Sequence, residues 1–156
     1  MLMRSGFHKA AAAALSQLLQ FGVPSIDQRT LACPCGDQAR YLQLRSKTIL
    51  TVVGNVKVSR PYYLCSKCHC GQFPVDAELD IAGTEFSPGV RRMQATVGQH
   101  APFDQGRKQM KDLAGLEVTT KSIERNAEAI GADIAACEQR EIGKAIQLDL
   151  PLIVGE

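Results

Sequence analysis

Five of the six cysteines in this 156-residue chain fall into two short clusters. The first is Cys33-Pro34-Cys35-Gly36, and the second covers residues 65–71. The residues between the clusters have the alternating and β-branched pattern of a β-hairpin, which would hold them side by side. Thiolates are soft ligands, and four of them suit a tetrahedral Zn²⁺ ion. The spacing therefore predicts a zinc-ribbon-like domain over residues 29–80. The predicted structural zinc ligands are Cys33, Cys35, Cys65 and Cys68.

Other uses of these cysteines stay open. Disulfides are one alternative, but the start of the chain lacks the apolar core of a secretory signal, which favours a reducing cytosol. The C-x-C spacing of the first cluster is one residue tighter than usual, and either His69 or Cys70 can replace a ligand. A redox or metal-handling protein that uses Cys68-His69-Cys70 is a further alternative. Cys137 stands alone, and we expect it to be a small buried apolar residue of a helix.

The hairpin prediction rests on two runs of residues. Residues 48–53 are β-branched and apolar, and residues 56–60 alternate between apolar and polar. Gly54-Asn55 lies between them and is typical of a hairpin turn. A domain of about 50 residues has little core, so a bound metal would supply part of its stability.

Helices are predicted on both sides of this domain. An alanine run predicts a helix from His8 to about Leu19 within an N-terminal segment, residues 1–28. Residues 86–148 are predicted to be helical, with a first helix that begins at Ser87-Pro88 and a second that begins at Pro102. The second helix is expected to turn Met110, Leu113 and Ala114 inward. The fold class is therefore α+β, mainly α.

The third predicted helix is capped by Thr119-Thr120 and runs from about Ser122 to Gln147. Its apolar residues recur at spacings of four and three, which predicts a continuous buried stripe or a short coiled-coil seam. The members of this stripe are Ile123, Ala127, Ile130, Ile134 and Cys137. A short helix, a tight turn and a capped helix favour a helix-turn-helix, with a plain helical hairpin as the alternative. The candidate DNA-binding residues are Thr120, Lys121, Ser122, Arg125, Arg91 and Arg92.

Charge adds a weaker argument. The net charge is only +2, but basic residues gather locally, in the predicted ribbon and on the later helices. The ribbon carries Arg40, Arg45, Lys47, Lys57, Arg60 and Lys67. Such basic faces are typical of phosphate contact, and an ordinary solvated surface is the alternative. No run approaches the roughly 18 apolar residues of a membrane span, so no membrane partner is expected.

Several longer segments carry a family resemblance. They include Leu50-Thr51-Val52-Val53-Gly54, Arg60-Pro61-Tyr62-Tyr63-Leu64-Cys65, Gly71-Gln72-Phe73-Pro74-Val75-Asp76, Phe86-Ser87-Pro88-Gly89-Val90-Arg91-Arg92 and Leu113-Ala114-Gly115-Leu116-Glu117-Val118-Thr119-Thr120-Lys121. With the first cysteine cluster, and with Ala127-Glu128-Ala129-Ile130-Gly131-Ala132-Asp133, they spread in order over most of residues 30–150. The chain resembles the amino-terminal portion of bacterial insertion-sequence transposases of the ISKra4 family. The resemblance implies a zinc-ribbon and helix-turn-helix front end that binds the double-stranded DNA of element ends in the bacterial cytoplasm, at the nucleoid.

The same family carries a DDE-type catalytic domain, whose first aspartate lies in an Asp-Gly-Thr motif just beyond this region. The chain contains no Asp-Gly pair, and residues 149–156 match only the run-up to that domain. No catalytic residue is therefore assigned, and Mg²⁺ is expected only in a full-length relative. We expect a truncated DNA-binding fragment that is inactive as a transposase. It would form a homodimer or pair with full-length transposase through residues 123–137. The alternative is a stand-alone DNA-binding regulator.

Overall fold

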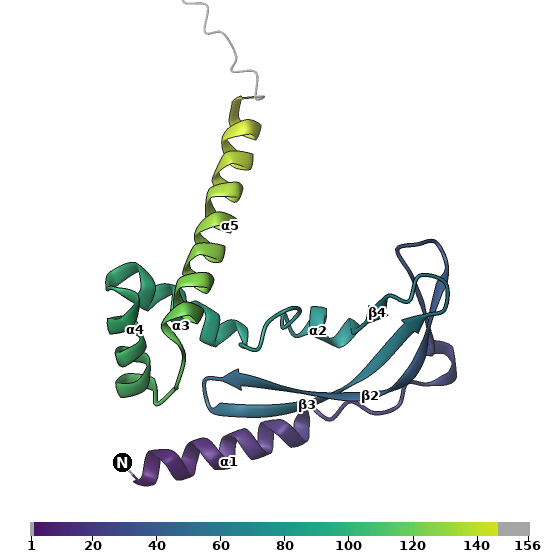
Figure 1. The fold of residues 1–156 in the computed structure, drawn as a ribbon, viewed down its shortest axis with the longest axis horizontal. Coiled ribbons are helices and arrows are strands. Elements are labelled where there is room, and N and C mark those ends of the chain that lie inside the picture. Colours follow the sequence, from purple (N-terminus) through teal and green to yellow (C-terminus); the bar gives the residue numbers. More distant parts are fainter. Residues whose placement is uncertain (1, 147–156) are drawn as a thin grey trace, which may run out of the picture. The chain divides into compact units, whose positions relative to one another are not determined.

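The computed structural model describes residues 2–146 and has a mixed α+β fold (Figure 1). The chain divides into two compact units, residues 1–92 and residues 93–156. The first unit contains a four-stranded antiparallel sheet, and the second is helical in the part that the structure describes. The predicted start of a catalytic domain at residues 149–156 lies outside the described residues.

The sheet has the strand order β1-β2-β3-β4, and each strand is antiparallel to its neighbour. Its strands are β1 (Thr30–Ala32), β2 (Gln38–Thr51), β3 (Gly54–Cys65) and β4 (Gly71–Gln72). The long strands β2 and β3 form the hairpin drawn across Figure 1. The two cysteine clusters lie in the short connections β1–β2 and β3–β4, so the sheet brings both connections to the same end of the hairpin.

The hairpin turn lies two residues earlier than predicted. Thr51 pairs with Gly54, so Val52 and Val53 form the turn and the prediction of Gly54-Asn55 is wrong. Gly54 has φ +111°, the conformation that lets a turn of this kind join right-twisted strands. The Thr51 hydroxyl donates to the Gly54 carbonyl at 2.8 Å and accepts from the Val53 amide at 3.3 Å. Hydrogen bonds of the Thr51 side chain therefore stabilise this turn, whose two central residues are not of the usual turn-forming types.

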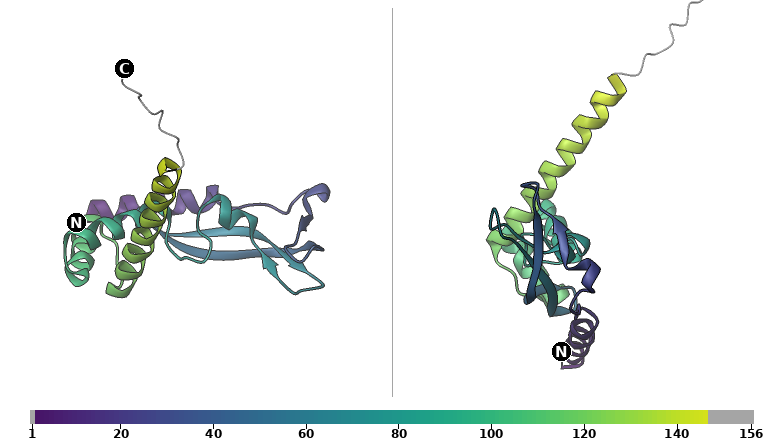
Figure 2. Two further views of the ribbon diagram at one scale, coloured as in Figure 1. Left: turned by 90° about the horizontal axis from the view of Figure 1, so that it is seen from above. Right: turned by 90° about the vertical axis from the view of Figure 1, so that its right-hand side faces the viewer.

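Helix α1 (Leu2–Leu18) packs along the hairpin near this turn (Figures 1 and 2). It begins several residues before His8, where the sequence predicted its start. Its end is joined to β3, since Ser59 donates its amide to the Leu19 carbonyl and accepts from the Phe21 amide. The buried core of this region is Ile49, Val56, Val58 and Ile81, covered by Ala12, Leu15, Leu19, Phe21, Val53 and Leu79.

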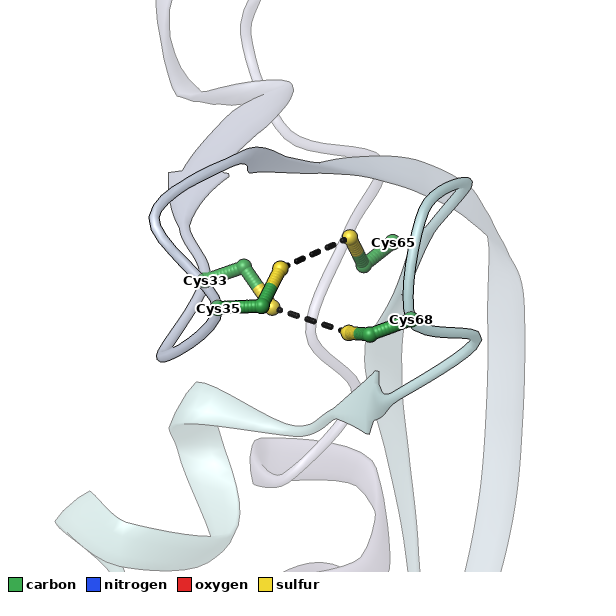
Figure 3. Close-up of side chains that lie close together, drawn as sticks. All are labelled: Cys33, Cys35, Cys65 and Cys68. Carbon is green, nitrogen blue, oxygen red and sulfur yellow. Dashed lines mark hydrogen bonds between the residues drawn. The ribbon is translucent and has the colours of Figure 1, made fainter.

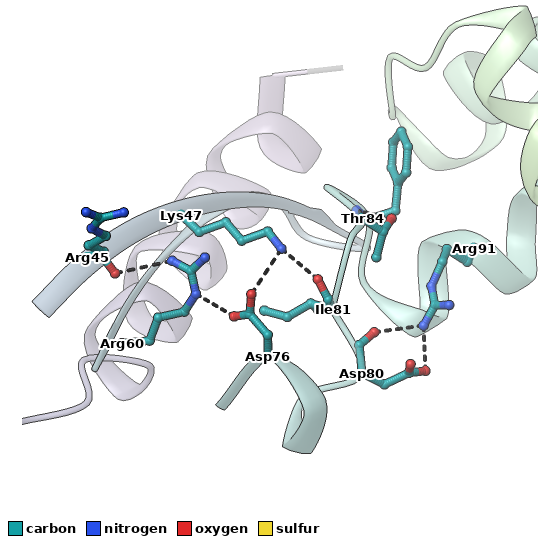
Figure 4. A network of polar contacts seen from close by, with 9 residues as sticks. Arg45, Lys47, Arg60, Asp76, Asp80, Ile81, Thr84 and Arg91 are labelled. Atoms are coloured by element: carbon teal, nitrogen blue, oxygen red, sulfur yellow. Dashed lines mark hydrogen bonds and ion pairs between the residues drawn. The ribbon is translucent and has the colours of Figure 1, made fainter. Parts of the chain in front are cut away.

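A buried ion-pair cluster fixes the short helix α2 (Pro74–Glu78) on the hairpin (Figure 4). Asp76 accepts a hydrogen bond from Arg60 Nε and lies 3.5 Å from Lys47 Nζ. Lys47 also donates to the Ile81 carbonyl at 2.6 Å. Lys47 and Arg60 are therefore engaged inside the first unit. The sequence had suggested that both belong to an open basic face, and the structure does not place them there.

The helices after the sheet are α3 (Pro88–His100), α4 (Phe103–Gln109), the π-helical turn η2 (Met110–Ala114) and α5 (Thr120–Ile146). Gly115 ends η2 with φ +69°, a left-handed conformation that suits glycine. Thr119 caps α5, because its hydroxyl accepts the Ser122 amide at 3.1 Å. The predicted end of this helix at Gln147 lies outside the described residues. No helix of the described residues is long and apolar enough to cross a membrane.

Small residues bring the helices of the second unit together. A Cβ at Gly98 would lie 3.0 Å from the Ala127 Cβ, and one at Gly106 would lie 3.1 Å from Val97. Gln94 is fully buried, and its amide bonds both Ser122 and Asn126 of α5, which fixes the register of α3 against α5. The apolar core includes Met110, Leu116 and Ile123. Leu113, in contrast, is 77% exposed, so its predicted inward position is wrong.

The predicted stripe of α5 is buried only near its beginning. Ile123 is fully buried, but Ile134 is 47% exposed and Cys137 is exposed as well. All residues from 131 to 142 are exposed, because no other element of the described residues packs on this part of the helix. The predictions of a continuous buried stripe and of a buried Cys137 are therefore wrong for the single chain.

Candidate metal centre

The structure brings the four predicted ligands together (Figure 3). The sulfur atoms of Cys33, Cys35, Cys65 and Cys68 all lie within 4.8 Å of one another. The Cys33 and Cys68 sulfurs are 3.4 Å apart, and those of Cys35 and Cys65 are 3.7 Å apart. These distances exceed the roughly 2.05 Å of a disulfide bond, and all four residues are free thiols.

The first cluster is a tight turn that directs both of its sulfurs the same way. The Gly36 amide donates to the Cys33 carbonyl at 2.9 Å, with Pro34 at the second turn position, which proline favours. Gly36 has φ +85°, a conformation that a residue with a side chain rarely adopts. The left-handed Gly36 therefore allows the short C-x-C spacing to supply two ligands from one turn.

The second cluster is a turn at the end of β3. The His69 amide donates to the Cys65 carbonyl at 3.0 Å, and the Cys65 amide donates to the Cys70 carbonyl at 3.1 Å. His69 has φ +57° at this turn, and its side chain is exposed. Within residues 2–146, neither His69 nor Cys70 belongs to the cluster of close ligand atoms. The geometry thus selects Cys65 and Cys68 from the alternatives that the sequence left open.

The cluster has a buried side and an exposed side. Cys33 and Cys65 are 6% and 0% exposed and belong to a small core with Ala39 and Tyr63, whereas Cys35 and Cys68 are exposed. The Tyr63 hydroxyl donates to the Gln28 carbonyl at 2.9 Å, which fixes the segment that leads into β1. The ligands are therefore anchored from the core and open to solvent on the other side.

The thiols share their protons unequally. The backbone amide of Cys70, followed by the thiols of Cys33 and Cys35, donates hydrogen bonds that lower the pKa of Cys68 to about 6. The backbone amide of Cys35 favours the Cys33 thiolate, but burial and the bonds to Cys68, Cys35 and Cys65 outweigh it and raise the pKa of Cys33 to about 12. The hydrogen bond and the charge of Cys68 raise the pKa of Cys70. Cys68 is therefore the thiol of the cluster that ionises most readily, and it accepts hydrogen bonds from its neighbours.

The cluster has the dimensions of a tetrahedral zinc site. Zn–S bonds of about 2.3 Å place the four sulfurs of a tetrahedron roughly 3.8 Å apart. Two sulfur pairs, at 3.4 and 3.7 Å, lie close to that value, and all four sulfurs lie within 4.8 Å of one another, so a metal ion needs only modest side-chain movements to bind. Four sulfur ligands also favour zinc over hard cations such as Mg²⁺ or Ca²⁺. These cysteines can hold a metal ion of this class.

The candidate DNA-binding residues lie in both units. In α5, Lys121 and Arg125 are exposed, while Thr120 and Ser122 are half-buried. The Ser122 hydroxyl donates to the Thr119 carbonyl at 2.8 Å and accepts from Gln94, so it is already engaged within the unit.

Arg91 and Arg92 belong to the first unit. Arg91 donates to the Asp80 backbone carbonyl at 2.8 Å and forms an ion pair with the Asp80 carboxylate (Figure 4). Arg92 is exposed on α3.

Sequence reasoning missed several residues that shape the cysteine end of the hairpin. Tyr62 and Phe73 stack with a centroid distance of 4.8 Å, and the Tyr62 ring covers the position that a Cβ of Gly71 would take. The glycine that follows the last cysteine of each cluster, Gly36 or Gly71, was the available signal, because a glycine often marks a positive φ or a close approach.

No protein-family model matches the chain, and no curated protein matches it significantly.

Proposed function

We propose that this chain is a zinc-stabilised DNA-binding module, equivalent to the amino-terminal part of an ISKra4-like transposase, that binds the ends of an insertion element. The resemblance of the sequence motifs supports the target. The fit of the four sulfurs to zinc supports the stabilising metal. The metal would tie β1 and the β3–β4 connection to the hairpin, and it has no part in a reaction.

The observation that carries DNA binding is the start of α5. Lys121 and Arg125 are four residues apart, so they share one face of the helix, and both are exposed. Neither forms an ion pair with a carboxylate of the described residues. The first turns of a helix also attract phosphate groups through their free amides and the helix dipole. This end of α5 therefore offers cations and helical amides to a phosphate backbone or a base edge.

The test compares duplexes that carry element ends with scrambled duplexes of equal composition, by fluorescence anisotropy with the zinc-loaded chain. Arg125→Ala should reduce the preference for element ends, because an arginine contact to a guanine edge contributes roughly 1–3 kcal/mol. Lys121→Ala should weaken binding to all duplexes to the same extent and reduce the salt dependence of the binding constant by about one unit of slope. Arg140→Ala is a matched control, since Arg140 is an exposed arginine of the same helix, several turns further on.

Absence of binding to every duplex at low salt would contradict the proposal. Binding with equal affinity to element ends and scrambled DNA, but tightly to another selected sequence, would favour a stand-alone regulator. A chain that retains no zinc and carries reactive thiols would favour the redox or metal-handling alternative.

Pairing of two copies, or of this chain with a full-length transposase, belongs to the same proposal. The exposed side chains of Ile134 and Cys137 on α5 support it, because the two residues lie on the predicted seam. Light scattering of the wild type and of Ile134→Glu tests it. A monomeric wild type at tens of micromolar would contradict the homodimer.

A further inference from the structure

The hairpin carries a marked excess of positive charge. Between residues 29 and 72 the sequence has seven lysine or arginine residues and one carboxylate, Asp37. Asp76 engages two of the seven, Lys47 and Arg60. A four-thiolate zinc site would add two negative charges, which still leaves the region positive. This excess of positive charge lies on the hairpin and its neighbouring segments, and the proposed role of α5 does not use it.

Five of these basic side chains are exposed and have no acidic partner within the described residues. They are Arg29, Arg40, Arg45, Lys57 and Lys67. None forms an ion pair with a carboxylate in residues 2–146. Unpaired cations in such excess over carboxylates are typical of a surface that contacts phosphates.

The middle of β2 is open on both faces and along one edge. Residues 42–46 are all exposed, although neighbouring strand residues point to opposite faces. The other edge of β2, away from β3, is paired with β1 only as far as Arg40, and the Tyr41 amide then donates to the Arg29 carbonyl. The next backbone hydrogen bond along this edge is at Leu50. No strand of the described residues covers this edge between them. A two-stranded antiparallel ribbon of this kind fits the major groove of B-DNA, which is about 12 Å wide.

Arg45 is held in a defined position at this open segment. Its guanidinium lies 3.8 Å from the centre of the Tyr62 ring, and Tyr62 stacks on Phe73. The Arg60 guanidinium lies 4.1 Å from the centre of the Phe73 ring, and Asp76 fixes Arg60. Stacking covers a flat face of the Arg45 guanidinium and leaves its N–H edge free to donate.

We propose that the middle of β2 is a second DNA-contacting surface, which lies in the major groove of a duplex, with Arg45 donating to a guanine edge and Arg40 contacting a phosphate. This inference rests on the proposed DNA-binding function and extends it from α5 to the hairpin. The occupant is a duplex because the half-buried ring of Tyr62 is already covered by Arg45 and so offers no platform for an unpaired base.

The experiment uses the zinc-loaded chain and 20-base-pair duplexes that the wild type has enriched from a random pool. Arg45→Lys keeps the charge but loses the planar fork, so it should lose about tenfold of the preference for the enriched duplex. Its affinity for unselected duplexes should stay unchanged. Arg40→Ala should weaken binding to every duplex and reduce the salt slope by nearly one unit.

Arg29→Lys is the matched control, because Arg29 is an exposed arginine of the same unit that precedes β1, outside the β2–β3 hairpin, and whose Nε donates to the Pro24 carbonyl. Zinc content and circular dichroism verify that each variant is folded. A full preference for the enriched duplex in Arg45→Lys would overturn the inference. Tighter binding of single strands than of duplexes would also overturn it. If only the substitutions of Lys121 and Arg125 reduced binding, the inference would be wrong, but the proposed function would stand. A wild type that binds no duplex would refute the proposed function and this inference together.

Discussion

The sulfur of Cys33 lies 3.4 Å from the sulfur of Cys68, although 35 residues separate the two in the sequence. The register of the hairpin produces this contact, because Ala39, just after the first cysteine cluster, pairs with Cys65. A slip of one residue would turn the strand side chains to the opposite face and separate the sulfurs. Metal binding is therefore a measure of the correct β2–β3 register.

We expect the purified chain to bind about one zinc ion, measured by plasma mass spectrometry, since four thiolates saturate one ion. Cys65→Ser and Cys68→Ser should each abolish zinc binding, and chelation should unfold the cysteine end of the hairpin while most of the helical circular dichroism remains. Cys70→Ser should have a milder effect, and Cys137→Ser, far along α5, should have none. Stoichiometric zinc in Cys65→Ser would contradict the assignment.

Zinc binding should release protons, and its affinity should rise with pH. The Cys33 thiol keeps its proton from pH 6 to pH 8, because its pKa is raised to about 12, and the pKa of Cys35 is also raised. Both must lose their protons to bind the metal, whereas Cys68, with a pKa lowered to about 6, is mostly ionised at pH 7. Calorimetry in two buffers of different ionisation enthalpy should therefore show more than one proton released per zinc at pH 7. An affinity that is independent of pH over this range would contradict the prediction.

The local patterns of the sequence predicted much of this arrangement. Cysteine spacing identified the four residues that the structure brings together, and β-branched alternation identified the hairpin. Thr119 and Pro88 marked the starts of two helices, because a cap or a proline acts on its own turn of the chain. Signals of this kind depend on neighbouring residues, which is why a single sequence can reveal them.

Features that depend on distant contacts could not be predicted in this way. From the sequence, Lys47 and Arg60 were expected to be surface cations. In the structure both pair with Asp76, which lies on a helix that was not predicted. Ile134 and Cys137 continue an apolar period, yet no element of the described chain packs on them. The turn at Val52-Val53 has no glycine at its centre, because Gly54 and the Thr51 hydroxyl supply the required geometry from its end.

Gly71→Ala should destabilise the cysteine end of the hairpin. A Cβ at this position would lie 2.5 Å from the Tyr62 hydroxyl oxygen and 2.6 Å from its Cε2, so the ring must move. We expect a loss of about 1–3 kcal/mol in the free energy of unfolding, as for other overpacked sites, measured by urea denaturation of the zinc-loaded chain. Displacement of Tyr62 should also release Arg45 from its stack.

Gly131→Ala is the matched control for this substitution. Beyond its chain neighbours and the backbone of its own helix, no atom of the described residues lies within 4 Å of the Cβ that it adds. The residue is inside α5, so alanine should stabilise the helix by about 0.5–1 kcal/mol. Equal effects of the two substitutions would show that the close contact between Tyr62 and Gly71 does not limit the position of the ring.

Asp76→Ala should be the most damaging single substitution outside the cysteines. Asp76 is buried and accepts from Arg60 Nε, so its removal leaves the Arg60 and Lys47 charges without a carboxylate. Loss of one partner from such a buried group costs about 3–5 kcal/mol in the free energy of unfolding. Urea denaturation measures this loss, and Asp104→Ala is the control, because the Asp104 pairs with Arg107 and Lys108 are exposed and should contribute little.

A triple variant separates two explanations for that loss. Lys47→Met, Arg60→Met and Asp76→Leu together remove all three charges and keep apolar volume at each position. If uncompensated charge causes the damage, the triple variant should regain most of the stability that Asp76→Ala loses, since well-packed apolar groups often equal a buried ion pair. If the triple variant is as unstable as Asp76→Ala, the geometry of the ion pairs itself fixes α2 on the hairpin, and the charge explanation is wrong.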